Sequence, residues 1–377
     1  MIALWCIGVA ALLQAYVLYP LSLLLRRTLP AGPAKREDPA AWPTLTLLIS
    51  AYNEERILRR KLENVTTLDY PRDRLRTIVV SDGSTDGTEA IARAFASGGI
   101  ELAAFAGRRG KVACLDLVVP RLTSDLVVMS DANSLYEPAS LKRLARHFGN
   151  PEVGCVCGEL LYENPGRLAS GEGERAYWGY ERRVKRLEGD RGILLGANGA
   201  IYAYRRTLFQ PVDPRMFCDD VIPIRIRIAG SRVLYEPSAR CVEEAVSEQT
   251  ELRRRRRHAS FGMRSMLAMV REALQAGRPL VAYQAISHRI LRWFGTIWLL
   301  LILAGTLWLP VPFRDVAAWG QGLLYGAALL GFVLDRLGIR VTILYLPYYA
   351  LALTAAGMAG LANFVLDTDR PFWEPRQ

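Results

Sequence analysis

TLTLLISAYNEE, at residues 44–55, changes abruptly from a strand-forming apolar run to polar and acidic residues. The same change occurs in TIVVSDGSTDGT, at residues 77–88, and in DLVVMSDANS, at residues 125–134. Apolar residues with helical spacing follow each run, over residues 57–65, 88–95 and 141–148. Strands that alternate with helices in this way predict a mostly parallel sheet with helices on both faces.

The residues directly after each predicted strand are candidate site residues, because ligands of open parallel sheets bind beyond the carboxyl ends of the strands. They are Ala51, Tyr52, Asn53 and Glu54 after the first strand, Asp82 after the second, and Asp131, Ala132 and Asn133 after the third. A carboxylate at Asp82 suits a ribose hydroxyl or a base N–H. Asp131 and Asn133 project to the same side of extended chain and suit Mg²⁺ or Mn²⁺ that also binds a diphosphate. Two simpler interpretations remain open, namely helix capping by Asn53 and a strand-ending turn at residues 131–133.

The composition excludes several classes of protein. The chain has 377 residues, of which 51% are hydrophobic and 23% charged, so it is not a disordered chain. Its six cysteines lack the spacing of a disulfide scaffold, and its three histidines argue against a His/Cys zinc site. The formal net charge is +11, and the hydrophobic residues are concentrated at both ends.

These apolar ends predict membrane spans. Charge-free runs cover residues 2–25, 293–313, 316–334 and 341–366, and a spanning helix needs about 20 apolar residues, so we expect four spans. Basic residues follow the first run and predict that the next domain is cytoplasmic: Arg26, Arg27, Lys35 and Arg36. We expect a multi-pass protein of the bacterial plasma (inner) membrane. The alternative is that these runs form buried helices of a soluble protein.

Four further motifs follow the strand ends in order along the chain. They are Gly110-Lys111, the segment GANGAIYAYRR at residues 196–206, CDDVIP at residues 218–223, and residues 225–237 with Gly230, Tyr235 and Pro237. Together with the strand ends they resemble the inverting glycosyltransferase family 2. The resemblance covers residues 44–262 and implies the GT-A fold, a Rossmann-like mixed sheet that binds nucleotide-diphospho-sugars.

The resemblance implies a role for each motif. The strand-end residues and Lys111 would bind the nucleotide-sugar, and Asp131 with Asn133 would hold Mg²⁺ or Mn²⁺. Many family members have a second Asp where Asn133 stands, and a neutral amide is a weaker ligand. Asp220, the second acid of the pair with Asp219, would be the general base of a single inverting displacement. The acceptor side would consist of Gly196, Asn198, Gly199 and Arg206. A simpler interpretation of residues 219–220 is a helix N-terminus, where acids are favoured.

Five consecutive arginines, residues 253–257, precede His258. Polymerising members of the family carry Gln-x-x-Arg-Trp here, and aligning Arg257 with its Arg puts Arg254 and His258 at the Gln and Trp positions. Arg257 is therefore the candidate for stabilising the leaving diphosphate, while the missing Gln and Trp weigh against a processive enzyme. The other arginines suit anionic lipid headgroups. The absence of interleaved aromatic residues argues against nucleic acid.

The predicted organisation has six parts: a transmembrane helix at 1–25, a linker at 26–43, a cytoplasmic GT-A domain at 44–262, an interfacial amphipathic segment at 263–290, three transmembrane helices at 291–366 and a tail at 367–377. We expect a membrane-bound glycosyltransferase that moves a sugar from a nucleotide-sugar, with UDP-sugars favoured. The acceptor would be lipid-linked or a glycan, in cell-envelope or exopolysaccharide synthesis. The alternatives are a processive polysaccharide synthase of the cellulose, chitin or hyaluronan type, and an inactive nucleotide-binding scaffold. The oligomeric state stays open.

Overall fold

The computed structural model describes residues 1–25, 38–39, 41–163, 172–244, 248–339 and 341–366; the side chains of residues 172–178 and 248–257 lie outside this description. The chain divides into two compact units. One contains residues 27–163 and 188–245, and the other contains residues 1–26, 164–187 and 246–369. We refer to them as the sheet unit and the apolar-helix unit.

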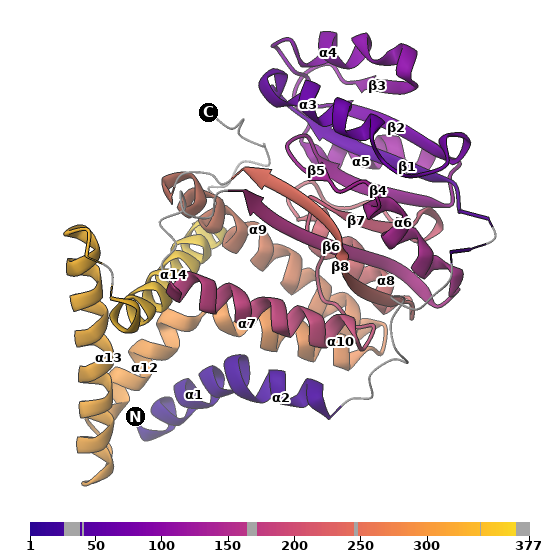
Figure 1. Cartoon of the computed structure of the whole chain (residues 1–377). Helices are drawn as coiled ribbons and strands as arrows, with labels where there is room; N and C mark the ends of the chain where they lie inside the picture. Colours follow the sequence, from indigo (N-terminus) through magenta and orange to yellow (C-terminus); the bar gives the residue numbers. More distant parts are fainter. Residues whose placement is uncertain (26–37, 40, 164–171, 245–247, 340, 367–377) are drawn as a thin grey trace. The chain divides into compact units, whose positions relative to one another are not determined.

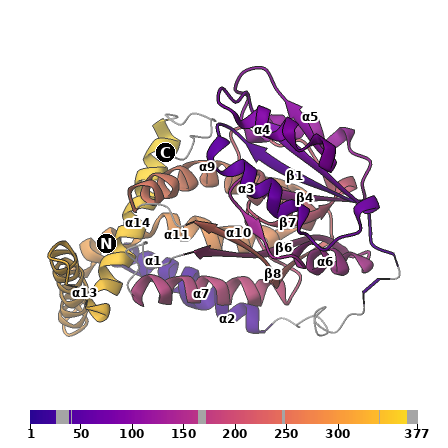
Figure 2. The same ribbon diagram turned by 45° about the horizontal axis from the view of Figure 1, so that its top comes forward.

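The described part of the sheet unit contains an eight-stranded mixed sheet (Figures 1 and 2) with strand order β3-β2-β1-β4-β7-β6-β8-β5. The strands are β1 (Leu45–Ala51), β2 (Leu75–Ser81), β3 (Ile100–Ala104), β4 (Leu126–Asp131), β5 (Leu135–Tyr136), β6 (Val153–Glu163), β7 (Tyr202–Arg205) and β8 (Arg232–Glu244). The first four strands in this order, β3, β2, β1 and β4, run parallel to one another. The next strand, β7, runs antiparallel to both β4 and β6. The mixed α/β architecture predicted from the sequence is confirmed.

The parallel register brings the polar strand ends to one edge of the sheet. Ala51 at the end of β1 pairs with Ser81 at the end of β2, and Ser50 pairs with Asp131 at the end of β4. Asp82 therefore lies beside the first residues after β1, and Asp131 lies on the other side of the same strand. The ends of β1, β2 and β4 therefore meet at one edge of the sheet, as the sequence predicted.

The helices of the sheet unit are α3 (Glu55–Thr66), α4 (Thr88–Ala94), α5 (Lys111–Val118), α6 (Ser140–Ala145) and α8 (Cys218–Ile228). α3 forms because its apolar residues recur at helical spacing, and it buries Leu58, Leu62 and Val65. These side chains pack with Leu47 and Ile49 of β1 in one core cluster, so α3 covers this face of the sheet (Figure 2).

Several elements of the sheet unit were not predicted, among them β3, β5, β6, β7, β8 and α5. β3 and α5 lie in residues 96–124, for which the sequence pattern indicated no structure. β3 is a short strand that pairs only with β2 among the described strands, and its burial is partial. The amphipathic signal that would reveal such an edge strand is therefore weak.

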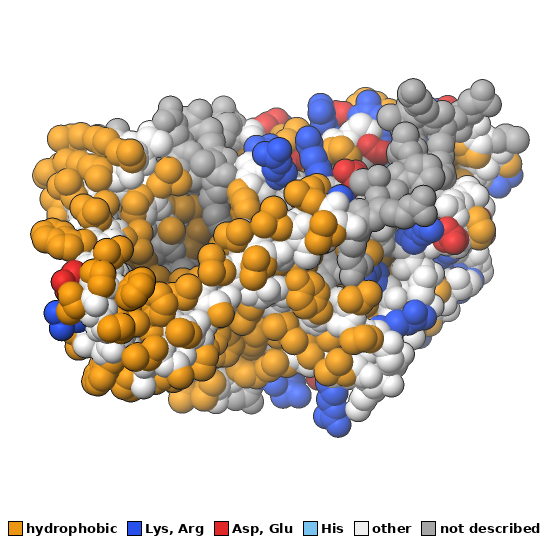
Figure 3. Space-filling model, turned by 90° about the horizontal axis from the view of Figure 1, so that it is seen from below, with side chains coloured by type: hydrophobic (Ala, Val, Ile, Leu, Met, Phe, Trp, Pro, Cys, Tyr) orange, Lys and Arg blue, Asp and Glu red, His pale blue; other side chains and the backbone are white. Residues whose placement is uncertain are grey.

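The apolar-helix unit contains α1 (Ile2–Leu13), η1 (Gln14–Leu18), α2 (Tyr19–Leu24), α7 (Glu172–Gly189, with residues 188–189 in the sheet unit), α9 (Glu248–Gln275), α10 (Pro279–Ala285), η8 (Ile286–Ile290), α11 (Leu291–Trp293), α12 (Gly295–Thr306), α13 (Phe313–Arg336) and α14 (Thr342–Leu366). Three helical segments in the described residues are long and apolar enough to cross a membrane: Ile2–Leu24, Phe313–Arg336 and Thr342–Leu366. Their large side chains are widely exposed, as the hydrophobic surface in Figure 3 shows.

The predicted span at residues 293–313 differs from the structure. Gly295–Thr306 forms a helix of 12 residues, which is about 18 Å long and shorter than the hydrocarbon core of a bilayer. A bend of 68° separates it from the helical segment Pro279–Trp293. A fourth span in the described residues exists only if this bent pair counts as one, and Arg289 and Arg292 lie just before the bend.

The predicted domain limits 44–262 also differ from the contact units. α7 up to Leu187 and the start of α9 associate with the apolar helices rather than with the sheet. The predicted tail at 367–377 and most of the predicted linker at 26–43 lie outside the described residues.

Candidate active site

Asp82 organises the loop that precedes α5. Its Oδ1 accepts a hydrogen bond from the backbone N–H of Arg109 at 2.6 Å, and its Oδ2 accepts one from Gly110 at 3.0 Å. Gly110 adopts a φ of 91°, a conformation that side chains other than glycine rarely tolerate. The Cys114 thiol also donates to Oδ1, at 3.4 Å. Asp82 thus holds Gly110 and Lys111 beside the sheet edge, although these residues lie 28 and 29 positions later in the sequence.

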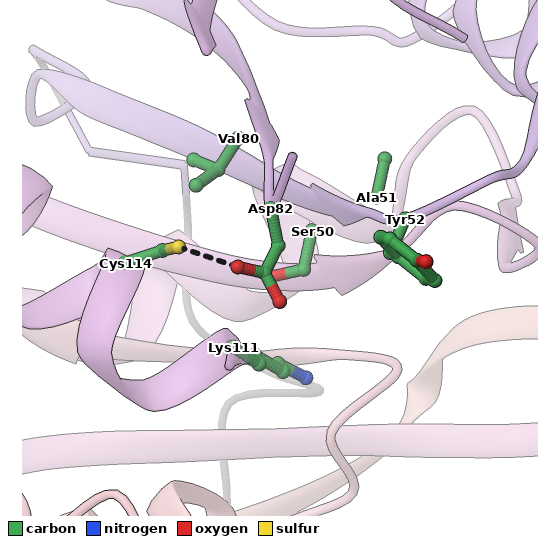
Figure 4. Close-up of a pocket in the computed structure, with 7 residues that line it drawn as sticks. All are labelled: Ser50, Ala51, Tyr52, Val80, Asp82, Lys111 and Cys114. Carbon is green, nitrogen blue, oxygen red and sulfur yellow. Dashed lines mark hydrogen bonds between the residues drawn. The ribbon is translucent and has the colours of Figure 1, made fainter. Parts of the chain in front are cut away.

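A pocket opens at this edge (Figure 4), lined by Ser50, Ala51, Tyr52, Val80, Asp82, Lys111 and Cys114. The guanidinium of Arg108 lies 3.8 Å from the centroid of the Tyr52 ring. An aromatic ring next to a cation provides a stacking surface for a base and a positive charge for a phosphate. Arg108 was not predicted as a site residue, and its only signal is its position directly before the Arg109-Gly110-Lys111 sequence.

Lys111 and Asp131 form a largely buried ion pair. Nζ of Lys111 lies 2.9 Å from Oδ1 of Asp131, and the two side chains are 13% and 14% exposed. Burial by itself would lower the pKa of Lys111, but the carboxylates of Asp131 and Asp219 raise it well above its usual value. The ammonium therefore stays charged at neutral pH. Its attraction to Asp219 also connects the strand end with the predicted acid pair.

The acid pair lies at the start of α8, where Asp219 and Asp220 occupy the first helical turn. The backbone N–H of Ala197 donates to the Asp219 carbonyl at 2.9 Å. A side chain at Gly199 would collide with the Asp219 carboxylate, so this glycine lets the segment approach the acid closely. Asn198 anchors the same segment to β6, because its amide donates to the Gly158 carbonyl at 3.2 Å. The structure therefore brings residues 196–199 and the acid pair together.

The polar residues after β1 contact the next loop. Asn53 has a φ of 52° and accepts a hydrogen bond from the N–H of Thr85 at 2.8 Å. The N–H of Glu54 donates to the Thr88 hydroxyl at 2.8 Å. These bonds tie the β1 and β2 ends together and agree with a structural role. Direct binding of a ligand by Asn53 and Glu54 stays a prediction.

One predicted residue is not brought to this edge, and the position of a second is not described. Arg206 follows β7, whose last residue Arg205 pairs with Leu126 at the opposite end of β4 from Asp131. The Arg206 guanidinium donates to the Ser124 carbonyl at 3.0 Å, so packing uses it away from the acid pair. Arg257 belongs to α9, but its side chain lies outside the described residues.

The residues at the end of β4 fit a divalent cation as two protein ligands. The side-chain nitrogen of Asn133 is buried, and the position that it faces holds no hydrogen-bond acceptor from the described residues. Rotating this amide would present its oxygen there, beside Asp131. No cluster of three or more His, Cys, Asp or Glu that could hold a metal occurs in the described part of the chain. Mg²⁺ is often held by one or two carboxylates with substrate phosphates, so two protein ligands are compatible with a site completed by the donor.

Comparison with known proteins is consistent with this geometry. Residues 46–212 match the family described as glycosyl transferase family 2. YdaM of Bacillus subtilis, a probable glycosyltransferase, is 32% identical over 35% of this chain and 33% of its own length. A beta-monoglucosyldiacylglycerol synthase of Synechocystis is 30% identical over 30% of this chain and 25% of its own length. The chain thus spans about a third or less of these relatives.

A solved structure extends the similarity of fold over the whole chain. The mannosyltransferase PcManGT from Pyrobaculum calidifontis, in complex with GDP-Man and Mn²⁺, superposes with a TM-score of 0.70. The alignment covers 97% of this chain and 100% of that one, at 22% identity. Residues 46–212 therefore match a glycosyltransferase family 2 domain, and the superposition supports the GT-A fold, in agreement with the resemblance found in the sequence.

Proposed function

We propose that the chain is a membrane-bound inverting glycosyltransferase that moves a sugar from a nucleotide-sugar to a lipid-linked or glycan acceptor. The observation that carries the proposal is the Lys111–Asp131 ion pair, with Asp219 close enough to act on the same ammonium. It supports one site that combines the ends of β1, β2 and β4 with the acid pair of α8. UDP-sugars come first among the candidate donors, and GDP-sugars are the main competitor.

The donor would lie across the sheet edge. The base would stack near Tyr52 in the pocket, where Asp82 fixes the loop that holds Lys111 in place. Lys111 would place its positive charge near the diphosphate, where it stabilises the charge of the leaving group. Asp131 and Asn133 would hold Mg²⁺ or Mn²⁺, and the cation, when bound, would neutralise part of the diphosphate charge.

The acceptor would approach from the side of residues 196–199. Asp220 would accept the proton of the acceptor hydroxyl as its oxygen bonds to the anomeric carbon. The bond from this carbon to the diphosphate oxygen breaks on the opposite face, so the anomeric configuration inverts. Asp219, held against Gly199, would keep the acid pair in place.

The apolar helices support a membrane location. Three of them are long and apolar enough to span a bilayer, and α10 exposes Leu280 and Tyr283. We propose that the protein is a multi-pass protein of the plasma (inner) membrane with its sheet unit in the cytoplasm, and that residues 263–290 lie at the interface. Synthesis of cell-envelope glycolipid or exopolysaccharide would use such an enzyme, because its acceptor or product is membrane-bound or exported.

The test is release of nucleoside diphosphate by the full chain purified in detergent. A panel of UDP- and GDP-sugars is offered with Mg²⁺ or Mn²⁺ and a membrane lipid extract. We expect turnover with one donor, and we expect Asp220→Asn to lower kcat by about 10²- to 10⁴-fold without weakening nucleotide binding. Asp213→Asn, at a partly exposed aspartate that pairs with Arg215, is the matched control.

Each outcome has a definite meaning. Addition of one sugar supports the proposal, whereas a long polymer identifies a processive synthase. Nucleotide binding without turnover for any donor identifies an inactive scaffold. Undiminished turnover of Asp220→Asn removes the general-base role from Asp220.

A further inference from the structure

Lys61 is a fully buried lysine that the proposed mechanism does not use. It lies on the core-facing side of α3 and is 0% exposed. Its ammonium donates a hydrogen bond to the carbonyl of Ser134 and lies 4.0 Å from the centroid of the Tyr136 ring. Burial lowers the pKa of Lys61 to about 7, while Cys241, Asp131 and Glu243 act in the opposite direction. An ammonium at such a depth is costly, so its contacts matter for the segment that it holds.

The segment held by Lys61 is the continuation of the candidate metal site. Ser134 closes the turn that begins at Asp131, because its N–H donates to the Asp131 carbonyl at 3.3 Å. Asn133 lies inside this turn. A displacement of the Ser134 carbonyl therefore changes the positions of both predicted metal ligands.

A second side chain of α3 forms hydrogen bonds with the same segment. Asn64, three residues after Lys61 and on the same helix face, donates to the Tyr136 carbonyl at 2.9 Å and accepts from its N–H at 2.8 Å. The Tyr136 hydroxyl in turn lies within hydrogen-bond distance of the carbonyls of Met129 and Ala200 and shares its one proton between them, so the residue is fixed at both ends.

The opposite side of the segment rests on β8. The Ser134 hydroxyl donates to Oε1 of Glu243 at 2.6 Å, and both side chains are buried. Leu135 pairs with Val242 in the antiparallel β5–β8 ladder. The turn is thus held from both sides, by Lys61 on α3 and by Glu243 on β8.

We propose that Lys61 is a positioning residue for the metal site, holding the Asp131–Ser134 turn through the Ser134 carbonyl. It does not touch the donor or the cation. This inference rests on the proposed function for its biological meaning, but it concerns cation binding, which is measured without sugar transfer.

The simpler interpretation is that Lys61 only balances the buried charge of Glu243. The double variant Lys61→Met/Glu243→Gln separates the two roles, because it removes both charges but does not restore a donor to Ser134. Lys142→Met is the matched control, since Lys142 pairs with Asp69 at 2.6 Å and contacts no predicted ligand.

The experiment measures the Kd of Mn²⁺ alone by electron paramagnetic resonance, on the full chain in detergent, with thermal unfolding recorded for every variant. We expect Lys61→Met to raise this Kd by about 10- to 100-fold, the range found when outer partners of metal ligands are removed. The double variant should recover thermal stability yet keep the raised Kd. Lys142→Met should bind Mn²⁺ like the unaltered chain.

Two results with the variants would overturn the inference. One is an unchanged Kd in Lys61→Met, and the other is a normal Kd in the double variant, which would reduce Lys61 to a charge partner. Failure of the unaltered chain to bind Mn²⁺ would also overturn it, while the transfer assay with metal omitted would still report on the proposed function. If the Mn²⁺ Kd values are as expected but no sugar is transferred to any acceptor, the proposed function is contradicted and this inference is supported.

Discussion

The ammonium of Lys111 lies 2.9 Å from Oδ1 of Asp131, in a site where the same carboxylate is the predicted ligand of a divalent cation. The lysine and the cation would therefore compete for Asp131 in the absence of donor. When the diphosphate arrives, it offers the ammonium a second anionic partner. The ion pair is thus compatible with the proposed site for a metal and a diphosphate.

Lys111→Met tests this competition. Without the ammonium, we expect Mn²⁺ to bind more tightly to the free protein, while the KM for the donor rises about tenfold or more. The second effect follows because a hydrogen bond to a charged group contributes about 1.5–3 kcal/mol. Mn²⁺ titration followed by donor saturation curves measures both. Weaker Mn²⁺ binding, or an unchanged KM, would contradict a counter-ion role for Lys111.

Asn133→Asp should strengthen the metal site. The amide nitrogen of Asn133 is buried without a partner among the described residues, and a second carboxylate at this position would supply a charged ligand. We expect the Kd of Mn²⁺ to fall on the order of tenfold, and Asn133→Ala to raise it. If Asn133→Asp leaves the Kd unaltered, residue 133 is not a ligand.

Gly199→Ala should impair catalysis more than donor binding. The added Cβ would collide with the Asp219 carboxylate, and a displaced acid pair would lower kcat while the base pocket stays intact. Overpacking of this kind costs about 1–3 kcal/mol. Gly98→Ala is the matched control, because a Cβ at Gly98 meets nothing within 4 Å among the described residues. Equal kcat values for the two variants would show that the acid pair tolerates the displacement.

The buried pair of His147 and Glu236 should make stability depend on acid pH. Burial would raise the pKa of Glu236, but hydrogen bonds from His147, at 2.8 Å, and from Ser238 lower it below its usual value. A carboxyl whose pKa is lower in the folded chain stabilises the fold above its unfolded pKa of about 4.3 and loses this contribution as the pH falls. Urea unfolding at neutral and at acid pH should show a smaller decline for Glu236→Gln than for the unaltered chain. A parallel decline would exclude Glu236 as a source.

Much of the fold was predictable because its first half consists of short, regular elements. Strands β1, β2 and β4 were predicted to within one or two residues, since each is a buried apolar run that ends in polar residues. The short partner strand β3 was missed because its burial is partial. The short length of α12 was also missed, because the helix ends at Thr306 although the residues after it are still mostly apolar, and hydropathy carries no information on where a helix ends.

The candidate site was predictable only where its residues follow strand ends. Asp82, Asp131 and Lys111 do assemble at one edge, whereas Arg206 forms a packing contact at the far end of β4. Lys61 was missed because a lysine on an amphipathic helix is usually a solvated residue. Only its position on the face with Leu58 and Leu62 indicates otherwise.

The sequence by itself predicted the resemblance to the family, the parallel sheet and the edge at which we propose that a ligand binds. These follow from local periodicity and from the rule that parallel strands present their ends together. The tertiary structure decided which charged groups meet, such as Lys111 with Asp131 and Lys61 with Ser134, which are 20 and 73 residues apart. Such pairs depend on how helices pack on the sheet, because a side chain's burial and partners arise from contacts that residue spacing does not encode.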